Sequence, residues 1–377
     1  MKRYLSVLAL AATITMGFSA CQKLDGALKT DSEAAPEAIS LTPLTYTPTK
    51  AIVYGTTFPD DLSIHATAYF NSNTGTTAGT KYFDKVKFDK TTEGTYSGKW
   101  IPQYTYYWPV QGSLSMYAIV YNKNSEGTEY NNVTATFPDT DNKTFSVKVD
   151  SLRADQDILI GANRDAKKTE AGDKMTFYHI SSLIEVQMAS SENFIVQTGD
   201  VTDKMSGIAV TGVKIDTIYQ SITEFNATRD NENNTFSFTP TASGTQADRE
   251  IYSGDTIRLY KAPAVEMYTF GKKKTEFTPE ATADNKGNRI IVPAQTKTTM
   301  TIKYKLYNGS DGNASPELTC TVTLPQIDTQ TDHTTEWLAG KKYTYKVTIG
   351  LDKITIVPDV SDWVNTDVSV PANTPVV

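Results

Sequence analysis

Hydrophobic and polar residues alternate with a period of two along much of the chain. The alternation is clearest in five segments, namely 62–70, 114–120, 145–149, 300–306 and 343–349. A period of two predicts β-strands that turn one face toward a core, and the Val, Ile, Thr and Tyr in these segments suit such a surface. Residues 114–120 are apolar or aromatic at nearly every position, so we expect that strand to be covered on both faces.

Polar turn clusters separate the strand-like segments, and long helical periodicity is hard to find in the sequence. The clusters are rich in Asn, Asp, Gly and Ser and lie at 71–79, 122–127, 231–234 and 308–313. Many short antiparallel strands joined by polar turns predict an all-β fold made of β-sandwiches.

The length of 377 residues predicts two domains, since a domain usually holds roughly 100–200 residues. We therefore expect two tandem β-sandwich domains with about seven strands each. The boundary is placed near residue 190, which gives an N-terminal sandwich at 51–190 and a C-terminal sandwich at 191–377.

Composition and charge exclude several classes of protein. The chain is 39% hydrophobic and 21% charged, which is ordinary for a globular protein and excludes a wholly disordered or collagen-like chain. The net charge is −7, whereas a nucleic-acid binder needs an excess of Lys and Arg to neutralise phosphates. We expect no nucleic-acid partner.

Residues that carry catalysis or bind metals are scarce. The histidines are His65, His179 and His333, and the cysteines are Cys21 and Cys320. None of them stands in the spacing of a metal site or of a nucleophile motif. We therefore predict no enzymatic activity, no catalytic residues, no metal site and no cofactor. His179 is expected to be a core histidine with a hydrogen-bond partner, and Cys320 a small buried residue.

The N-terminus has the pattern of an export signal. Lys2 and Arg3 precede an apolar run at 4–16 that is too short to span a membrane, and small residues follow. This pattern predicts a signal peptide at 1–20. The small residues and the cysteine after them resemble the lipobox of bacterial lipoproteins, in which Cys21 becomes the acylated mature N-terminus. A plain signal peptide followed by a chance cysteine is the alternative.

Residues 21–50 differ from the strand-rich body of the chain. They are rich in Ala, Thr, Pro, Glu and Lys, and their first half is typical of a flexible tether. Residues 39–46 have the composition of a short strand. Pro43 lacks a backbone N–H, so we expect this strand at the edge of a sheet.

The tryptophans support a second functional hypothesis. Trp100, Trp108 and Trp337 would bind sugars if their rings formed an exposed platform, and the protein would then be a glycan-binding surface lipoprotein. Tryptophans more often anchor strands inside a core, and burial of the three rings would exclude this hypothesis.

Three clusters of residues follow one another in an order and spacing that resemble one known family. The first cluster, 100–121, contains Tyr-Tyr-Trp-Pro, and the second, 157–186, contains Asp-Ile-Leu-Ile-Gly-Ala and Phe-Tyr-His. The third, 336–363, begins with Glu-Trp-Leu-Ala-Gly and closes with Asp-Trp. Together they resemble the fimbrillins, the pilus subunits of Bacteroides-type bacteria. The resemblance implies β-sandwiches of transthyretin-like topology, export to the outer membrane as a lipoprotein, and assembly with other subunits into a surface fimbria.

The resemblance also implies a proteolytic maturation step. In fimbrillins, a trypsin-like surface protease cuts after an Arg that precedes an Ala, and this cut removes the N-terminal segment with its first strand. Here Lys50 precedes Ala51, and no Arg lies between Cys21 and Arg153. Lys50 is therefore the expected cleavage site. An uncut, lipidated subunit that anchors the base of the pilus is the alternative.

The C-terminal tail, 364–377, has the pattern of a strand that fills the groove left in the next subunit. Its inward positions would be Val364, Thr366, Val368 and Val370, which alternate with polar residues. Such an extended peptide can add to an open sheet edge. An ordinary last strand or a frayed end is the alternative.

Overall fold

The computed structural model describes most of the chain between Glu37 and Asp362. The one helix among the described residues is the 3-10 turn η1 (Gly94–Tyr96), and the other regular elements there are β-strands. The expectation of an all-β fold is confirmed. The described residues are 37–45, 58, 62–72, 80–121, 129, 131–137, 145–153, 156–168, 173–190, 207–229, 236–259, 268–269, 289–296, 298–308, 313–325, 327–329, 332–334, 336–350 and 353–362.

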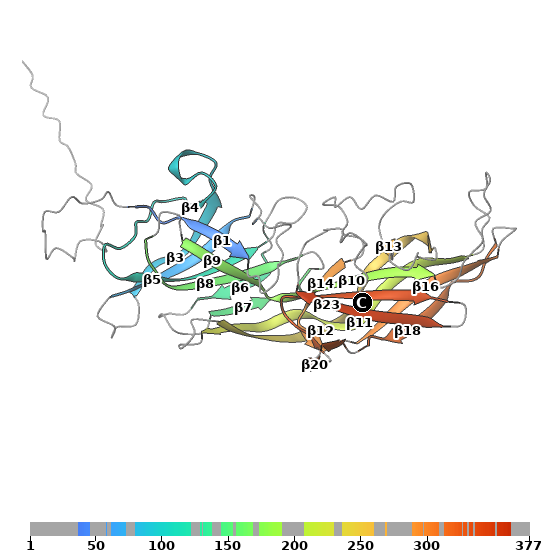
Figure 1. Ribbon diagram of the computed structural model, residues 1–377. Helices are drawn as coiled ribbons and strands as arrows, with labels where there is room; N and C mark the ends of the chain where they lie inside the picture. Colours follow the sequence, from blue (N-terminus) through green and yellow to red (C-terminus); the bar gives the residue numbers. More distant parts are fainter. Residues whose placement is uncertain are drawn as a thin grey trace, which may run out of the picture. The chain divides into compact units, whose positions relative to one another are not determined.

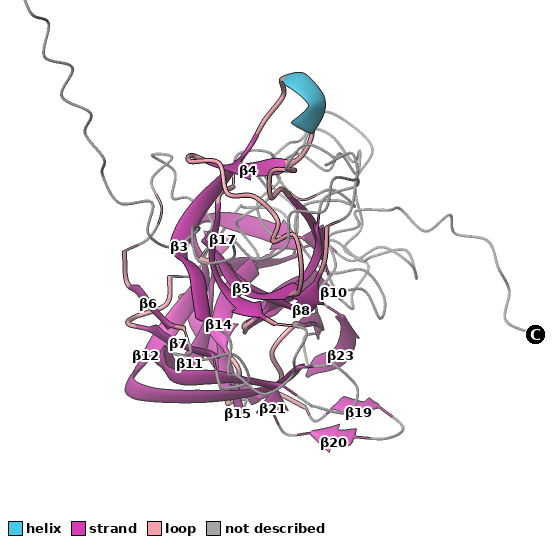
Figure 2. Cartoon of the chain, turned by 90° about the vertical axis from the view of Figure 1, so that its left-hand side faces the viewer, coloured by secondary structure: helices cyan, strands magenta, loops and turns pink. Residues whose placement is uncertain are grey.

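A closed barrel contains the first strands of the chain (Figure 1). Figure 2 views the molecule at right angles to Figure 1, and there β3, β4, β5 and β8 curve around a ring. Each strand pairs with the next around the barrel, and the last pairs with the first. Their order is β1 (Leu41–Thr45), β4 (Trp100–Pro102), β3 (Thr80–Lys90), β2 (Ile64–Asn71), β5 (Ser113–Tyr121), β8 (Ile158–Ala166) and β9 (Asp173–His179).

Strands β2 and β5 show how the alternating sequence fills this barrel. They pair in antiparallel register along their lengths, with Ile64 opposite Val120, and both of these side chains are fully buried. The other face of β5 is also covered, because Tyr117 and Ile119 belong to a separate apolar cluster. The expectation that the strand at 114–120 is covered on both faces is confirmed.

Two larger sheets and two short strand pairs complete the described fold. The first sheet contains β13 (Tyr268–Thr269), β10 (Ser181–Ser190), β14 (Arg289–Pro293), β22 (Lys341–Ile349) and β23 (Ile354–Asp362). The second contains β17 (Asn313–Ala314), β16 (Thr299–Asn308), β18 (Leu318–Thr323), β11 (Gly207–Arg229), β12 (Phe236–Leu259), β7 (Phe145–Val149) and β6 (Val133–Thr136). The short pairs are β15 (Gln295–Thr296) with β21 (Glu336–Trp337), and β19 (Ile327–Thr329) with β20 (Asp332–Thr334).

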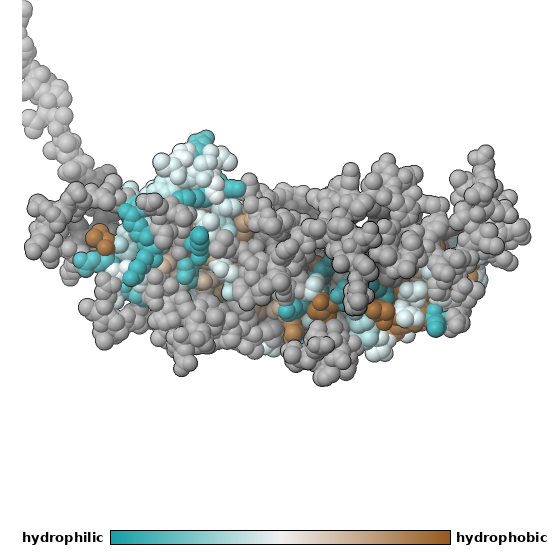
Figure 3. Space-filling model, viewed as in Figure 1, coloured by the Kyte–Doolittle hydropathy of each residue, from teal (hydrophilic) through white to brown (hydrophobic). Residues whose placement is uncertain are grey.

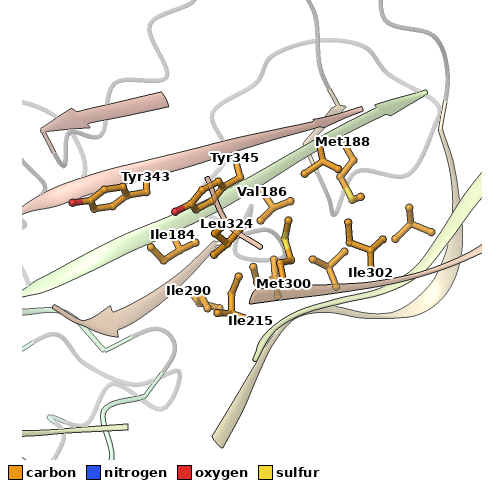
Figure 4. Close-up of a cluster of buried hydrophobic side chains, with 14 of the residues drawn as sticks. Ile184, Val186, Met188, Ile215, Ile290, Met300, Ile302, Leu324, Tyr343 and Tyr345 are labelled. Carbon is orange, nitrogen blue, oxygen red and sulfur yellow. The ribbon is translucent and has the colours of Figure 1, made fainter. Parts of the chain in front are cut away.

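A second apolar core draws its side chains from both larger sheets, as expected for a β-sandwich. Trp337 is fully buried in it, and its indole N–H donates to the hydroxyl of Tyr345 over 2.9 Å. The alternating residues of β10 and β22 face those of β11 and β16. Figure 4 shows this packing, with Ile184, Val186, Met188, Ile215, Ile290, Met300, Ile302, Leu324, Tyr343 and Tyr345 labelled.

Strands β11 and β12, of 23 and 24 residues, are much longer than the sequence pattern indicates. β12 lies along one edge of β11, while the other edge pairs first with β16 and then with β7. The side chains of β11 consequently enter two cores. Ile215 belongs to the core of Figure 4, and Ile222 and Phe225 belong to a third cluster together with Tyr117 and Val147.

The side-chain amide of Gln295 hydrogen-bonds to the backbone of β11 at the point where that strand changes from one partner strand to the next. Its Oε1 accepts the backbone N–H of Tyr219 over 2.8 Å, and its Nε2 donates to the Tyr219 carbonyl over 3.2 Å. The nearby Thr217 has a φ of 51°, and the register with β12 shifts on both sides of it. One amide thus pairs with both backbone groups of a residue between two ladders.

The domain boundary near residue 190 stays a prediction. β10, which ends at Ser190, pairs with β22, and its side chains belong to the core of Figure 4. β6 and β7 join the sheet of β11. Two strands from before residue 190, β7 and β10, therefore pair with strands from after it.

Candidate functional site: the docked N-terminal strand

The segment from Glu37 to Thr45 precedes the expected cleavage site and completes the barrel. β1 runs parallel to β9 over its whole length, from Leu41 opposite Asp173 to Thr45 opposite Phe177, and Figure 1 shows the two strands side by side. It meets β4 in antiparallel register at Leu41. The segment is therefore held on both sides by strands that come later in the chain.

The residues just before β1 pair with the loop that follows β4. Ala38 forms an antiparallel bridge with Tyr107. The N–H of Ile39 donates to the Tyr106 carbonyl over 2.7 Å, and the N–H of Trp108 donates to the Glu37 carbonyl over 3.0 Å. This short ladder extends the contact of the docked segment beyond β1 itself.

Alternate side chains of the docked segment fill the barrel core. Ile39 and Leu41 are fully buried, and Pro43 is buried as well. Ile39 and Leu41 join a cluster that includes Phe58 and Trp100. At roughly 1.5–3 kcal/mol for each large apolar side chain, burial of Ile39 and Leu41 alone contributes about 3–6 kcal/mol to docking.

Aromatic residues form the floor under the docked segment. The ring of Phe58 meets Trp100 edge-on, with ring centres 5.2 Å apart, and lies 5.4 Å from Phe177. The indole N–H of Trp100 donates to the Leu62 carbonyl over 2.8 Å. Sequence reasoning missed Phe58 because it is an isolated apolar residue among turn formers. The Phe-Pro pair at 58–59 is the signal that would have pointed to it.

Polar contacts fasten the outer face of the segment. Nζ of Lys168 lies 3.3 Å from Oε2 of Glu37, with the lysine half exposed, and the N–H of Ala38 donates to the hydroxyl of Tyr96 over 3.3 Å. An exposed ion pair contributes only about 0–1 kcal/mol. Burial of Ile39 and Leu41 is therefore the larger part of what holds the segment.

The position of β1 differs from the expected edge strand. It lies between β4 and β9, and Pro43 is opposite Met175 of β9. A proline is tolerated there because the pairing with β4 stops at Leu41. Beyond that residue β1 has a strand neighbour on one side only. Pro43, which has no backbone N–H to donate, can therefore sit there as it would in an edge strand.

The sequence-predicted site residues lie outside the described residues. They are the lipidation residue Cys21, the cleavage pair Lys50 and Ala51, and the donor residues Val364, Thr366, Val368 and Val370. β23 ends at Asp362, two residues before Val364, and is the last strand in the order of its sheet.

The glycan-binding hypothesis requires three exposed tryptophan rings, and the structure contradicts that requirement. Trp100, Trp108 and Trp337 are 4%, 6% and 0% exposed, so their rings form no exposed platform. The first two belong to the barrel core and the third to the core of Figure 4. Large flat rings gain more from burial at strand ends than they lose in polar contact, because an indole N–H such as that of Trp100 can find an acceptor inside.

His179, Cys320 and His65 lie in three different environments within the described part of the chain. His179 is buried, with Nδ1 2.9 Å from Oδ1 of Asp157, which confirms a core histidine. Cys320 is a free cysteine and is half-buried rather than buried. His65 lies 3.0 Å from Glu129 in a shallow pocket beside Tyr121, whose pKa is raised to about 12 by burial and then by the Glu129 charge.

The described residues contain no group of three or more His, Cys, Asp or Glu side chains placed to hold a metal ion. None of their helices has the length and apolar character needed to cross a bilayer.

These features define an all-β protein in which a segment near the N-terminus is inserted between later strands. The chain matches the fimbrillin-like family over residues 49–363, and it belongs to that family. The resemblance seen in the three clusters is confirmed. Fimbrillins are structural proteins, so the chain is a structural protein and not an enzyme.

One solved structure of low sequence identity shares the fold, and others align with most of the chain. A fimbrial protein from Bacteroides vulgatus is 16% identical, with a TM-score of 0.53 over 86% of this chain and 99% of that one. A candidate cell adhesion protein from Bacteroides uniformis is also 16% identical, with a TM-score of 0.42 over 86% and 98%. The tip fimbrial protein Mfa3 from Porphyromonas gingivalis is 8% identical, with a TM-score of 0.35 over 87% and 100%. No curated protein matches the sequence.

Proposed function

We propose that the protein is a structural subunit of a surface pilus and that its subunits assemble by strand exchange. It is exported as an outer-membrane lipoprotein through acylation of Cys21, and a trypsin-like surface protease cuts between Lys50 and Ala51. The cut releases β1, and the C-terminal tail of a neighbouring subunit takes its place. One observation carries the proposal: a segment that precedes Lys50 supplies Ile39 and Leu41 to the barrel core.

Loss of the docked segment would leave a groove that another extended segment could fill favourably. Its floor would expose apolar side chains, and its walls would carry backbone groups without partners, such as the Tyr106 carbonyl and the Trp108 N–H. Such an edge pairs readily with another extended chain. Every wall residue follows Ala51 in the sequence, so the groove stays on the matured subunit.

The tail has a pattern that fits this groove. Ile39, Leu41 and Pro43 are buried residues of the docked segment that stand two apart, and Ser40 between the first two is buried as well. Val364, Thr366, Val368 and Val370 repeat that spacing. Ordering eight residues costs about 8–16 kcal/mol, which a free peptide would not recover from four side chains worth roughly 1.5–3 kcal/mol each. Proteolysis favours exchange because it makes exposure of the groove irreversible.

A substitution in the tail tests the exchange. Val368→Asp places a charge on the groove side of the donor and should abolish polymer, while the subunit stays folded. Ser369→Asp adds the same charge on the opposite side and should leave the polymer intact. Polymer of normal length from the Val368→Asp chain would remove the tail from the mechanism.

Mass spectrometry of surface-released protein tests the maturation step. Chains should begin at Ala51, and Lys50→Ala should give an uncut chain that does not polymerise. The alternative is an uncut anchor subunit, which rests on the lysine in the place of the usual arginine. Chains that all begin at an acylated Cys21 would support that alternative.

A further inference from the structure

Three of the exposed large hydrophobic residues lie in one loop at the margin of the barrel. Tyr104, Tyr107 and Val110 are 72%, 46% and 101% exposed, and they fall between β4 and β5. We call these three residues the lip. Figure 3 shows brown, hydrophobic atoms in only a few places on the described surface that it displays. Scattered exposed hydrophobics need no explanation, but a group in one short loop indicates a contact surface.

Contacts with strand β3 hold the backbone near Tyr107 in place. The hydroxyl of Tyr82 donates to the Tyr107 carbonyl over 2.6 Å, and the buried Trp108 follows directly in the chain. The ring of Tyr106 packs against Phe83, with ring centres 5.2 Å apart. From Thr105 to Trp108 the residues alternate between more exposed and more buried, whereas residues 103–105 are all exposed. Tyr107 is therefore presented in a defined place.

The lip borders the groove at the end where the docked segment begins. Ala38 pairs with Tyr107, so a residue in the place of Ala38 puts its side chain beside the lip. Ala38 itself covers little of the tyrosine, which remains 46% exposed. After a cut at Lys50 the lip stays and Ala38 is lost.

The start of the tail resembles the start of the docked segment in its order of side chains. Glu37 stands two residues before Ile39, and Asp362 stands two residues before Val364. The residue between them is Ala38 in the docked segment and Trp363 in the tail. When Val364 takes the place of Ile39, an acidic residue returns to its place and a tryptophan replaces an alanine beside the lip.

A charge left by the cut supports this alignment. Lys168, which is half exposed, pairs with Glu37 over 3.3 Å, and maturation would remove that carboxylate. A donor that runs in the direction of β1 brings Asp362 toward Lys168. A donor that runs the opposite way would bring residues 371–377, which have no charged side chain, toward the same place.

We infer that the lip is the docking surface for Asp362 and Trp363 of a second copy of this chain. This inference rests on the proposed function and deepens it. The donor runs in the direction of β1, parallel to β9, with Val364 in the place of Ile39. The indole of Trp363 covers Tyr104 and Tyr107, and Asp362 pairs with Lys168. The contact joins two different surfaces of identical subunits, and such a head-to-tail contact builds an open filament when the rotation between subunits does not close into a ring.

Cysteine cross-linking of polymer from the full-length chain tests both direction and register. In a Cys320→Ser background, Tyr107→Cys combined with Trp363→Cys should give a ladder of disulfide-linked subunits. Directly opposed strand residues have Cα atoms about 4.5–5.5 Å apart, within the range of a disulfide. The matched pair, Tyr107→Cys with Val370→Cys, should stay unlinked. Linkage of the second pair, or of neither pair in a normal polymer, would overturn the inference.

Removal of the aromatic contact gives a second readout. Trp363→Ala should speed dissociation of the polymer about three- to tenfold, the range expected for one aromatic contact, whereas Trp363→Tyr should restore most of it. Tyr104→Ala should act like Trp363→Ala and leave the melting temperature of the subunit unchanged, because that ring is 72% exposed. Equal dissociation rates for all variants would refute the docking surface. Failure of the unsubstituted chain to polymerise would instead refute strand exchange as a whole.

Discussion

Leu41 stands directly opposite Trp100 where β1 meets β4, and both side chains are buried in the barrel core. One of them precedes the expected cleavage site and the other follows it. In the proposed maturation, each residue on the first side would be removed by the cut, and each on the second side would stay to line the groove. The two classes should therefore respond differently to substitution.

Leu41→Ala should lower the free energy of unfolding of the uncut chain by about 2–5 kcal/mol, because the residue is fully buried. Chemical denaturation measures this loss. Polymer made from the same variant should be as stable as the unsubstituted polymer, since the cut removes residue 41. An equal loss in precursor and polymer would show that β1 is never released.

Gly112→Ala should destabilise the chain more than Gly98→Ala. Both glycines have positive φ, 88° and 81°, so both substitutions carry the backbone strain of about 1–2 kcal/mol. A Cβ at Gly112 would also come within 2.4 Å of the Asn71 carbonyl oxygen, whereas one at Gly98 meets nothing within 4 Å. Thermal melts of the two variants measure the difference, and equal melting temperatures would contradict the close approach.

Lys342→Met should lower stability by about 3–5 kcal/mol, because it leaves the buried Glu185 carboxylate without its cation, which lies 2.6 Å away. Lys346→Met on the same strand is the control. Its exposed pair with Asp359 should be worth about 0–1 kcal/mol. The double variant Glu185→Gln with Lys342→Met should recover much of the loss, and no recovery would mean that the lysine acts through packing.

Stability should fall in alkaline solution between about pH 10 and pH 12. Burial raises the pKa of Tyr343 from 10.0 to about 12, partly offset by the hydrogen bond from the Leu338 N–H. The folded state holds this proton more tightly than the unfolded state, so the contribution is complete below pH 10 and is lost as pH rises toward 12. Each pH unit in that interval removes about 1.4 kcal/mol.

Tyr343→Phe provides the check on that pH dependence. The variant should show a shallower loss of stability between pH 10 and pH 12 in denaturant titrations, whatever its stability at neutral pH. An unchanged slope would assign the alkaline loss to other groups, such as Tyr121.

Local patterning predicted many of the strands and little of their pairing. The alternating segment at 343–349 became β22 (Lys341–Ile349), and the segment at 39–46 became β1 (Leu41–Thr45). Parallel pairing of β1 with β9 was not predictable, because nothing in either strand specifies a partner so distant in sequence. Alternation reports which residues face a core, and register depends on how the whole barrel closes.

The lengths of β11 and β12 were missed for a related reason. Their paired halves, 217–229 and 236–247, are rich in Thr and Ser. The register between the two strands also shifts repeatedly, so no single alternation runs along them. Burial of the tryptophans was equally invisible in the sequence. A tryptophan in a polar neighbourhood can stand on a surface or close a core, and the position of its neighbours in space decides between the two.

The change of partners along β11 has a mechanical consequence for a filament that bears load. Each half of this strand is hydrogen-bonded to two antiparallel neighbours. These are β16 and β12 for the first half, and β7 and β12 for the second. Tension drawn along such a strand must shear many hydrogen bonds at once rather than unzip them singly. A subunit built in this way resists extension by flow without any covalent cross-link between its strands.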